Sequence, residues 1–294
     1  MWIFLALISA FSSAGTSFAL KRAVEHGGSI VSTAAARMVA GVLLLALVAA
    51  LGVWPALTAE YWRAVALVLI PELLGTLFLT LALRAGDLSL VQPLLGLLPP
   101  LVMLGGVVFL HEVPTPTAGA GVALVTLGVY CVGLTPGGSA LEPLRALGRE
   151  RASWYAVASA CGWSLATLVH KRGIQAVGPF PWGVTLAFGS GLSLTALLAL
   201  VAWKAPAKLG LPGRATPWGW FVALAGFCFA AQQVGLHLAF RAAQTGYVMA
   251  LSSTGILFAT ALGVLFLRER AAAGTRVAGA MLVSAGAMLV AVFG

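Results

Sequence analysis

Long apolar runs, separated by short segments rich in charged residues, proline and glycine, dominate the chain. A helix that crosses a bilayer needs about 20 mostly apolar residues. Ten segments reach that length: residues 2–20, 30–52, 64–83, 89–110, 117–135, 153–170, 182–203, 218–240, 246–267 and 275–293. The pattern therefore predicts an all-α integral membrane protein with ten transmembrane helices.

Composition agrees with a lipid environment. Of the 294 residues, 61% are hydrophobic and only 9% are charged, whereas soluble domains carry about 25% charged residues. The net charge of +9 comes from basic residues that lie singly or in pairs between apolar runs. These features favour a bilayer as the partner and argue against nucleic acid, a soluble enzyme or a disordered chain.

The distribution of Lys and Arg predicts the orientation. Four of the 17 basic residues, Arg63, Lys171, Arg172 and Arg241, follow even-numbered segments or precede odd-numbered ones, and the other 13 lie on the opposite side. Because cytoplasmic loops carry the excess of Lys and Arg, we expect both termini to lie outside the cytoplasm. The membrane expected is the bacterial inner membrane.

The chain also repeats itself. Ser17–Val24 returns as Thr167–Ile174 at an offset of 150, and Ala82–Glu112 returns as Ala239–Glu269 at an offset of 157. The predicted units are residues 1–136 and 153–294, joined by a loop over 137–152. Each unit holds five helices, so the second must enter the membrane inverted. Inverted repeats around a central cavity are typical of alternating-access transporters, although a channel or a structural membrane protein could arise from the same duplication.

Both repeats end their fourth helix on the same motif. Residues 109–112 read FLHE and residues 266–269 read FLRE, and each is followed by a glycine-containing helix with Gly121 and Gly128 or Gly279 and Gly286. This pattern resembles the EamA-type transporters of the drug/metabolite transporter superfamily. The resemblance implies a ten-helix carrier, commonly a bacterial exporter of amino acids or other metabolites. Length and aromatic content are similar to the aromatic amino acid exporters of the YddG type.

Polar side chains recur on one face of several predicted helices. In segment 64–83, Glu72, Thr76 and Thr80 follow at a spacing of four residues, which places them on one helix face. Polar residues occupy equivalent positions in the other half, so we expect a shared central cavity. The predicted substrate-binding residues are Glu72, Thr76, Thr80, Gln92, Trp163, Thr167, Gln232, Gln233, His237, Ser252, Ser13 and Ser17.

Glu72 is the one acid deep inside a predicted span, and ionisable residues there mark functional sites by default. It would bind a cation such as a substrate ammonium, or take up a proton; a structural, protonated Glu72 is the alternative. For His237, site and structural roles stay equally open. Gln92-Pro93, Pro99-Pro100 and residues 252–255 interrupt two helices, and the freed backbone groups would hold a zwitterion or simply kink the bundle.

The prominent Glu112 and Glu269 are interpreted as ion-pair or helix-start residues at the membrane edge, each preceding the fifth helix of its half. The sequence contains no phosphate-binding loop, no GxSxG or HExxH motif and no metal-ligand spacing of Cys and His. We therefore expect no enzyme activity, cofactor or metal.

These observations predict a secondary active transporter that exports a small metabolite across the inner membrane by alternating access. Amino acids, aromatic or otherwise amphipathic, are the first candidates for the substrate. The alternatives are a passive channel or facilitator for small polar solutes, and a carrier of the multidrug or nucleotide-sugar type. The protein would be a monomer or a homodimer.

Overall fold

The computed structural model describes residues 1–86, 88–132, 134, 141, 150–204, 212, 216–266 and 273–293. Over these residues the chain is helical and contains no strand. The elements are α1 (Trp2–His26), α2 (Ser29–Leu51), α3 (Ala59–Ala85), α4 (Leu88–Leu95), α5 (Leu98–Gly105), the π-helix η1 (Gly106–Leu110), α6 (Pro116–Val132), α8 (Arg151–Val177), α9 (Pro179–Lys204), α10 (Trp218–Ala242), α11 (Thr245–Ser252), α12 (Gly255–Phe266) and α13 (Ala273–Phe293). The all-α prediction is confirmed for this part of the chain.

Six helices in the described residues are long and apolar enough to cross a membrane. They are Trp2–His26, Ser29–Leu51, Ala59–Ala85, Pro179–Leu200, Trp218–Ala242 and Thr245–Gly263, and shorter apolar helices cover Leu98–Leu110, Pro116–Gly128 and Met281–Val290. Large apolar side chains such as Phe11 and Phe227 are more than half exposed on the outside of the bundle. An exterior of this kind is stable in lipid, so the chain is a multi-pass membrane protein.

Helix α8 spans 27 residues but falls outside those six, although residues 153–170 were predicted to cross the membrane. Its buried serines, Ser153, Ser159 and Ser164, together with Lys171 and Arg172 near its end, lower its hydropathy. Its three serines are buried in the bundle interior.

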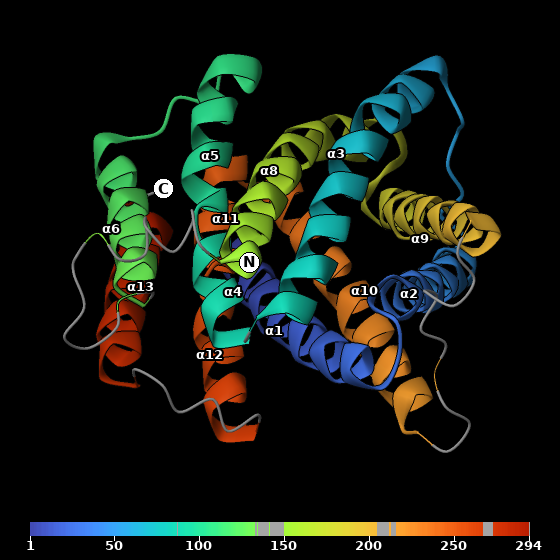
Figure 1. The fold of residues 1–294 in the computed structure, drawn as a ribbon. Coiled ribbons are helices and arrows are strands. Elements are labelled where there is room, and N and C mark those ends of the chain that lie inside the picture. Colours follow the sequence, from blue (N-terminus) through green and yellow to red (C-terminus); the bar gives the residue numbers. More distant parts are fainter. Residues whose placement is uncertain are drawn as a thin grey trace.

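The helices pack in pairs that join the first half of the chain to the second. Extensive contacts link α1 to α10, α3 to α8, α2 to α9 and α6 to α13. Figure 1 shows α6 and α13 side by side at one end of the molecule and α2 and α9 at the other, with α1, α3, α8 and α10 between them. The interior that these four central helices enclose is where the polar side chains gather.

Glycine makes the closest of these contacts possible. A Cβ on Gly235 would lie 2.7 Å from the carbonyl oxygen of Leu5, and one on Gly162 would lie 2.8 Å from the amide nitrogen of Gly75. Gly121 and Gly286 meet in the same way between α6 and α13, where a Cβ on Gly121 would lie 2.9 Å from the Gly286 carbonyl oxygen. Small residues let the helix backbones approach, as is usual in membrane bundles.

Two of the predicted spans are broken. A turn at residues 96–97 separates α4 from α5, and a turn at residues 253–254 separates α11 from α12. The first break lies before Pro99-Pro100 rather than at it, because proline is tolerated in the first turn of a helix and α5 carries it there. The pair Gln92-Pro93 lies within α4, and its side chains lie outside the described part.

Candidate functional site

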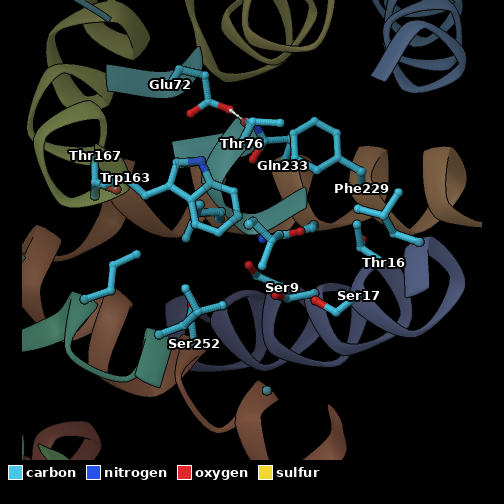
Figure 2. Close-up of a pocket in the computed structure, with 18 of the residues that line it drawn as sticks. Ser9, Thr16, Ser17, Glu72, Thr76, Trp163, Thr167, Phe229, Gln233 and Ser252 are labelled. Carbon is cyan, nitrogen blue, oxygen red and sulfur yellow. Dashed lines mark hydrogen bonds between the residues drawn. The ribbon is translucent and has the colours of Figure 1, made fainter. Parts of the chain in front are cut away.

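The central helices, α2 and the two broken spans enclose a cavity of about 140 Å³ that is lined by both polar and apolar side chains. Hydroxyl-bearing side chains of α1 form one wall, α3 and α8 form another, and α10 closes the side opposite α8 (Figure 2). The lining residues are Ser9, Ser13, Thr16, Ser17, Leu20, Thr33, Ala36, Arg37, Glu72, Thr76, Leu79, Thr80, Leu95, Leu98, Trp163, Thr167, His170, Ala225, Phe229, Gln232, Gln233, Leu236, Met249, Ser252, Ser253, Gly255 and Ile256. Residues from both halves of the chain therefore share one cavity.

Ten of the twelve residues predicted to bind substrate line this cavity: Glu72, Thr76, Thr80, Trp163, Thr167, Gln232, Gln233, Ser252, Ser13 and Ser17. His237 does not line it, and the side chain of Gln92 lies outside the described part of the structure. The structure brings the ten together, and their binding of a substrate stays a prediction.

Glu72 lies against a basic residue that sequence reasoning did not place in the site. Arg37 Nη1 is 3.8 Å from Glu72 Oε1, and both side chains are almost fully buried. Arg37 Nη2 donates to Thr76 Oγ1 at 3.2 Å, and Thr76 Oγ1 donates to Glu72 Oε1 at 3.3 Å. The three side chains form a continuous polar chain from α2 to α3, so Glu72 is half of an ion pair rather than a lone acid.

Arg37 is one of the 13 basic residues from which the orientation is predicted. Helix α2 begins at Ser29, so Arg37 lies about two turns inside it. A single basic residue that far inside an apolar span is the signal that could have found it, since such residues face a bundle interior and find partners there.

Phe229 supports the guanidinium from the opposite side. The Arg37 Cζ lies 3.5 Å from the centre of the Phe229 ring, a cation–π contact that is stronger away from water. Arg37 Nη1 has no hydrogen-bond partner among the described residues. The group is thus held in place while one of its donor nitrogens keeps hydrogen-bonding capacity.

Trp163 forms a flat wall because α3 leaves room for it. A Cβ on Gly75 would lie 2.8 Å from Trp163 Nε1, so the indole packs directly on the backbone of α3. Ser159 Oγ donates to the Gly75 carbonyl at 2.7 Å and Thr167 Oγ1 donates to the Trp163 carbonyl at 2.7 Å. Figure 2 shows the indole between Glu72 and the serines of α1.

Hydroxyl groups provide most of the remaining polar lining. Thr33 Oγ1 and Thr80 Oγ1 are 2.8 Å apart, which joins α2 to α3 a turn beyond the ion pair. Ser253 Oγ donates to the Met249 carbonyl at 2.9 Å, whereas Ser252 Oγ has no partner among the described residues. Hydroxyl and amide side chains therefore share the described lining with apolar ones.

Two histidines, His170 and His237, lie inside the bundle. The rings of His170 and His237 are edge to face with centroids 5.4 Å apart, and His170 lines the cavity. His237 is completely buried and its Nδ1 donates to the Pro179 carbonyl at 3.1 Å. His237 packs behind His170 because the rotation of α10 turns it toward α9. In the described part of the chain, His, Cys, Asp and Glu do not gather in groups of three or more that could hold a metal ion.

Glu112 pairs with Lys171 of α8, as the ion-pair interpretation predicted. Its carboxylate also accepts from Thr245 N at 2.9 Å and from Thr245 Oγ1 at 3.2 Å. Glu112 precedes the fifth helix, α6, in the chain as expected, and its carboxylate accepts hydrogen bonds at the first residue of α11. The left-handed backbone of His111, with φ of 56°, turns the chain back after η1. Glu269 lies outside the described residues.

Comparison with known proteins supports the EamA-type resemblance. The model of the EamA-like transporter family matches residues 1–134. The matched residues make up slightly less than half of the chain. This match indicates a membrane transporter of small solutes. The predicted EamA-type resemblance is confirmed.

A solved structure has the same fold. The protein titled "Crystal structure of protein" aligns with a TM-score of 0.69 and 17% identity, over 98% of this chain and 96% of that one. At this identity the likeness concerns the fold. No curated protein matches the chain.

Proposed function

We propose that this EamA-like chain is a secondary active transporter that exports amino acids or similar small metabolites across the bacterial inner membrane by alternating access. The observation that carries the proposal is the buried Arg37–Glu72 pair on the cavity wall. An amino acid carries an ammonium and a carboxylate next to each other. Glu72 would bind the ammonium and Arg37 the carboxylate. Each charge of the ion pair would then be neutralised by the substrate as well as by the other residue.

The aromatic lining favours a partly apolar side chain. Trp163 and Phe229 flank the ion pair, and the cavity volume is close to the roughly 150 Å³ that accommodates a benzene ring. A substrate with an aromatic or similar side chain would place it between these rings, which supports the YddG-type resemblance. The other predicted lining residues would contribute hydroxyl and amide hydrogen bonds that orient the substrate.

Two inverted five-helix repeats would supply the alternation. The first repeat would comprise α1, α2, α3, the broken span α4–α5–η1 and α6, and the second would comprise α8, α9, α10, the broken span α11–α12 and α13. A two-fold axis in the membrane plane exchanges the pair α1–α10 with α8–α3 and maps the pairs α2–α9 and α6–α13 onto themselves. The packing of the helices agrees with all of these relations. In this arrangement both termini would face away from the cytoplasm.

The experiment is counterflow in liposomes that contain the purified protein. We expect labelled phenylalanine to enter saturably and faster when unlabelled phenylalanine is inside, which a channel or facilitator does not produce. Phenethylamine, which lacks the carboxylate, and 3-phenylpropionate, which lacks the ammonium, should each compete poorly.

Variants at the ion pair make the test specific. Arg37→Gln should weaken competition by phenylalanine but leave competition by phenethylamine unchanged. Glu72→Gln should weaken competition by phenylalanine but leave competition by 3-phenylpropionate unchanged. Arg63→Gln removes an exposed charge outside the cavity and serves as the control. Equal competition by all three compounds, or transport of drugs or nucleotide sugars without amino acids, would overturn the proposal.

A further inference from the structure

Two lysines occupy the same position in the two repeats but hold different partners. Lys21 near the end of α1 corresponds to Lys171 near the end of α8 at the offset of 150. Lys21 Nζ donates to the carbonyls of Leu83 and Gly86, each at 2.9 Å, at the end of α3. Lys171 Nζ donates to the carboxylate of Glu112 instead. The equivalent lysines of the two halves therefore bind different acceptors.

The end of α10 carries the same pair of carbonyls as the end of α3. At the offset of 157, Leu83 corresponds to Phe240 and Gly86 to Ala243. Gly86 has φ of −151° and ψ of 176°, and Ala243 has φ of −149° and ψ of 170°. Their amides donate one turn back in the same way, at 2.9 Å and 3.1 Å. The end of α10 therefore has the same backbone conformation as the end of α3, where two carbonyls accept from Lys21.

Lys171 lies beside the end of α10. A surface pocket is lined by Lys171, Gln175, Phe240 and Arg241, among others, and no side chain in the described residues donates to the Phe240 or Ala243 carbonyl. The Lys171 side chain is 28% exposed. Its ammonium sits on a flexible four-carbon stem with three donors, so it can move without a change in the helix.

Both positions suit a lysine. A carboxylate gives a charge-assisted hydrogen bond, and the last carbonyls of a helix attract a cation through their unpaired oxygens and the helix dipole. If Lys171 leaves, Glu112 still accepts two hydrogen bonds from Thr245. The exchange consequently leaves no buried carboxylate without a donor, which keeps its free-energy cost low.

We propose that Lys171 is a two-position switch that leaves Glu112 for the carbonyls of Phe240 and Ala243 when the carrier changes face, while Lys21 releases Leu83 and Gly86. The inference rests on the proposed alternating access, in which the two repeats exchange conformations. Glu112 and Lys21 would then both favour the conformation described here, and removal of either interaction would shift the carrier toward the opposite one.

The test measures from which side of the membrane the cavity is reached. Cys131, Cys161 and Cys228 are replaced by alanine, Ser13→Cys provides a reporter in the cavity wall, and an impermeant maleimide is applied to either side of oriented proteoliposomes. We expect Glu112→Gln and Lys21→Met each to move the ratio of labelling from the two sides in the same direction, by about tenfold or more, as the loss of at least one charge-assisted hydrogen bond implies. Arg172→Gln removes the neighbouring exposed charge on α8 and should leave the ratio unchanged.

Each outcome decides the matter without reference to the substrate. A shift in both variants supports the switch even if no amino acid is transported. Labelling from both sides with a ratio that neither variant changes would refute the switch and leave alternating access standing, and a lower melting temperature alone would then assign Glu112 a purely structural role. Labelling from one side only in every variant would refute both alternating access and the switch.

Discussion

Removal of Arg37 is the sharpest test of how the ion pair contributes to the fold. At 3.8 Å and an effective dielectric constant of about 20, two unit charges attract by roughly 4 kcal/mol. Breaking a buried pair by deleting one partner typically costs about 3–5 kcal/mol, because the other charge is left without compensation. Arg37→Met should lower the free energy of unfolding by an amount in that range, with part of the loss coming from the contact with Phe229.

A double-mutant cycle isolates the interaction between the two charges. Glu72→Met alone should also destabilise, since it leaves the Arg37 guanidinium buried, whereas the double variant Arg37→Met/Glu72→Met should be less destabilised than the sum of the two. Unfolding is followed by steric trapping in bicelles, with Arg63→Met as a control for the loss of an exposed charge. Additive effects, or single-variant losses below about 1 kcal/mol, would refute the conclusion that the two side chains stabilise the bundle as a pair.

Three further predictions follow from the packing. Gly235→Ala should lower the melting temperature in detergent because the new Cβ would meet the Leu5 backbone, while Gly219→Ala, where the added Cβ meets nothing within 4 Å, should not; equal melting temperatures would contradict the close contact. Gly75→Ala should push the Trp163 indole toward the cavity and raise the KM for phenylalanine in liposomes several-fold, and an unchanged KM would mean that the indole does not border the substrate. His170→Phe should change the preference between tyrosine and phenylalanine in competition assays, because it removes a polar group from the cavity wall; His237→Phe, one layer behind, should chiefly lower stability, and the reverse result would exchange the two assignments.

Sequence alone identified the features that depend on local composition. Apolar runs of about 20 residues predict membrane helices because the bilayer accepts few other structures, and the spacing of Glu72, Thr76 and Thr80 puts them on one face whatever surrounds the helix. The FLHE and FLRE motifs, with the glycines that follow them, were enough to indicate the family. The close approach of α6 and α13 at Gly121 and Gly286 then shows what such glycines do in the fold.

Tertiary structure decided which of these faces meet. Arg37 and Glu72 lie 35 residues apart on different helices, and Lys171 and Glu112 come from different halves of the chain, so no local pattern joins them. The carboxylate of Glu112 accepts hydrogen bonds at the start of α11, far from it in the sequence, and His237 donates to the Pro179 carbonyl instead of lining the cavity. The physical reason is that the rotation of a membrane helix about its axis is set by packing against its neighbours, which composition and spacing along one helix do not contain.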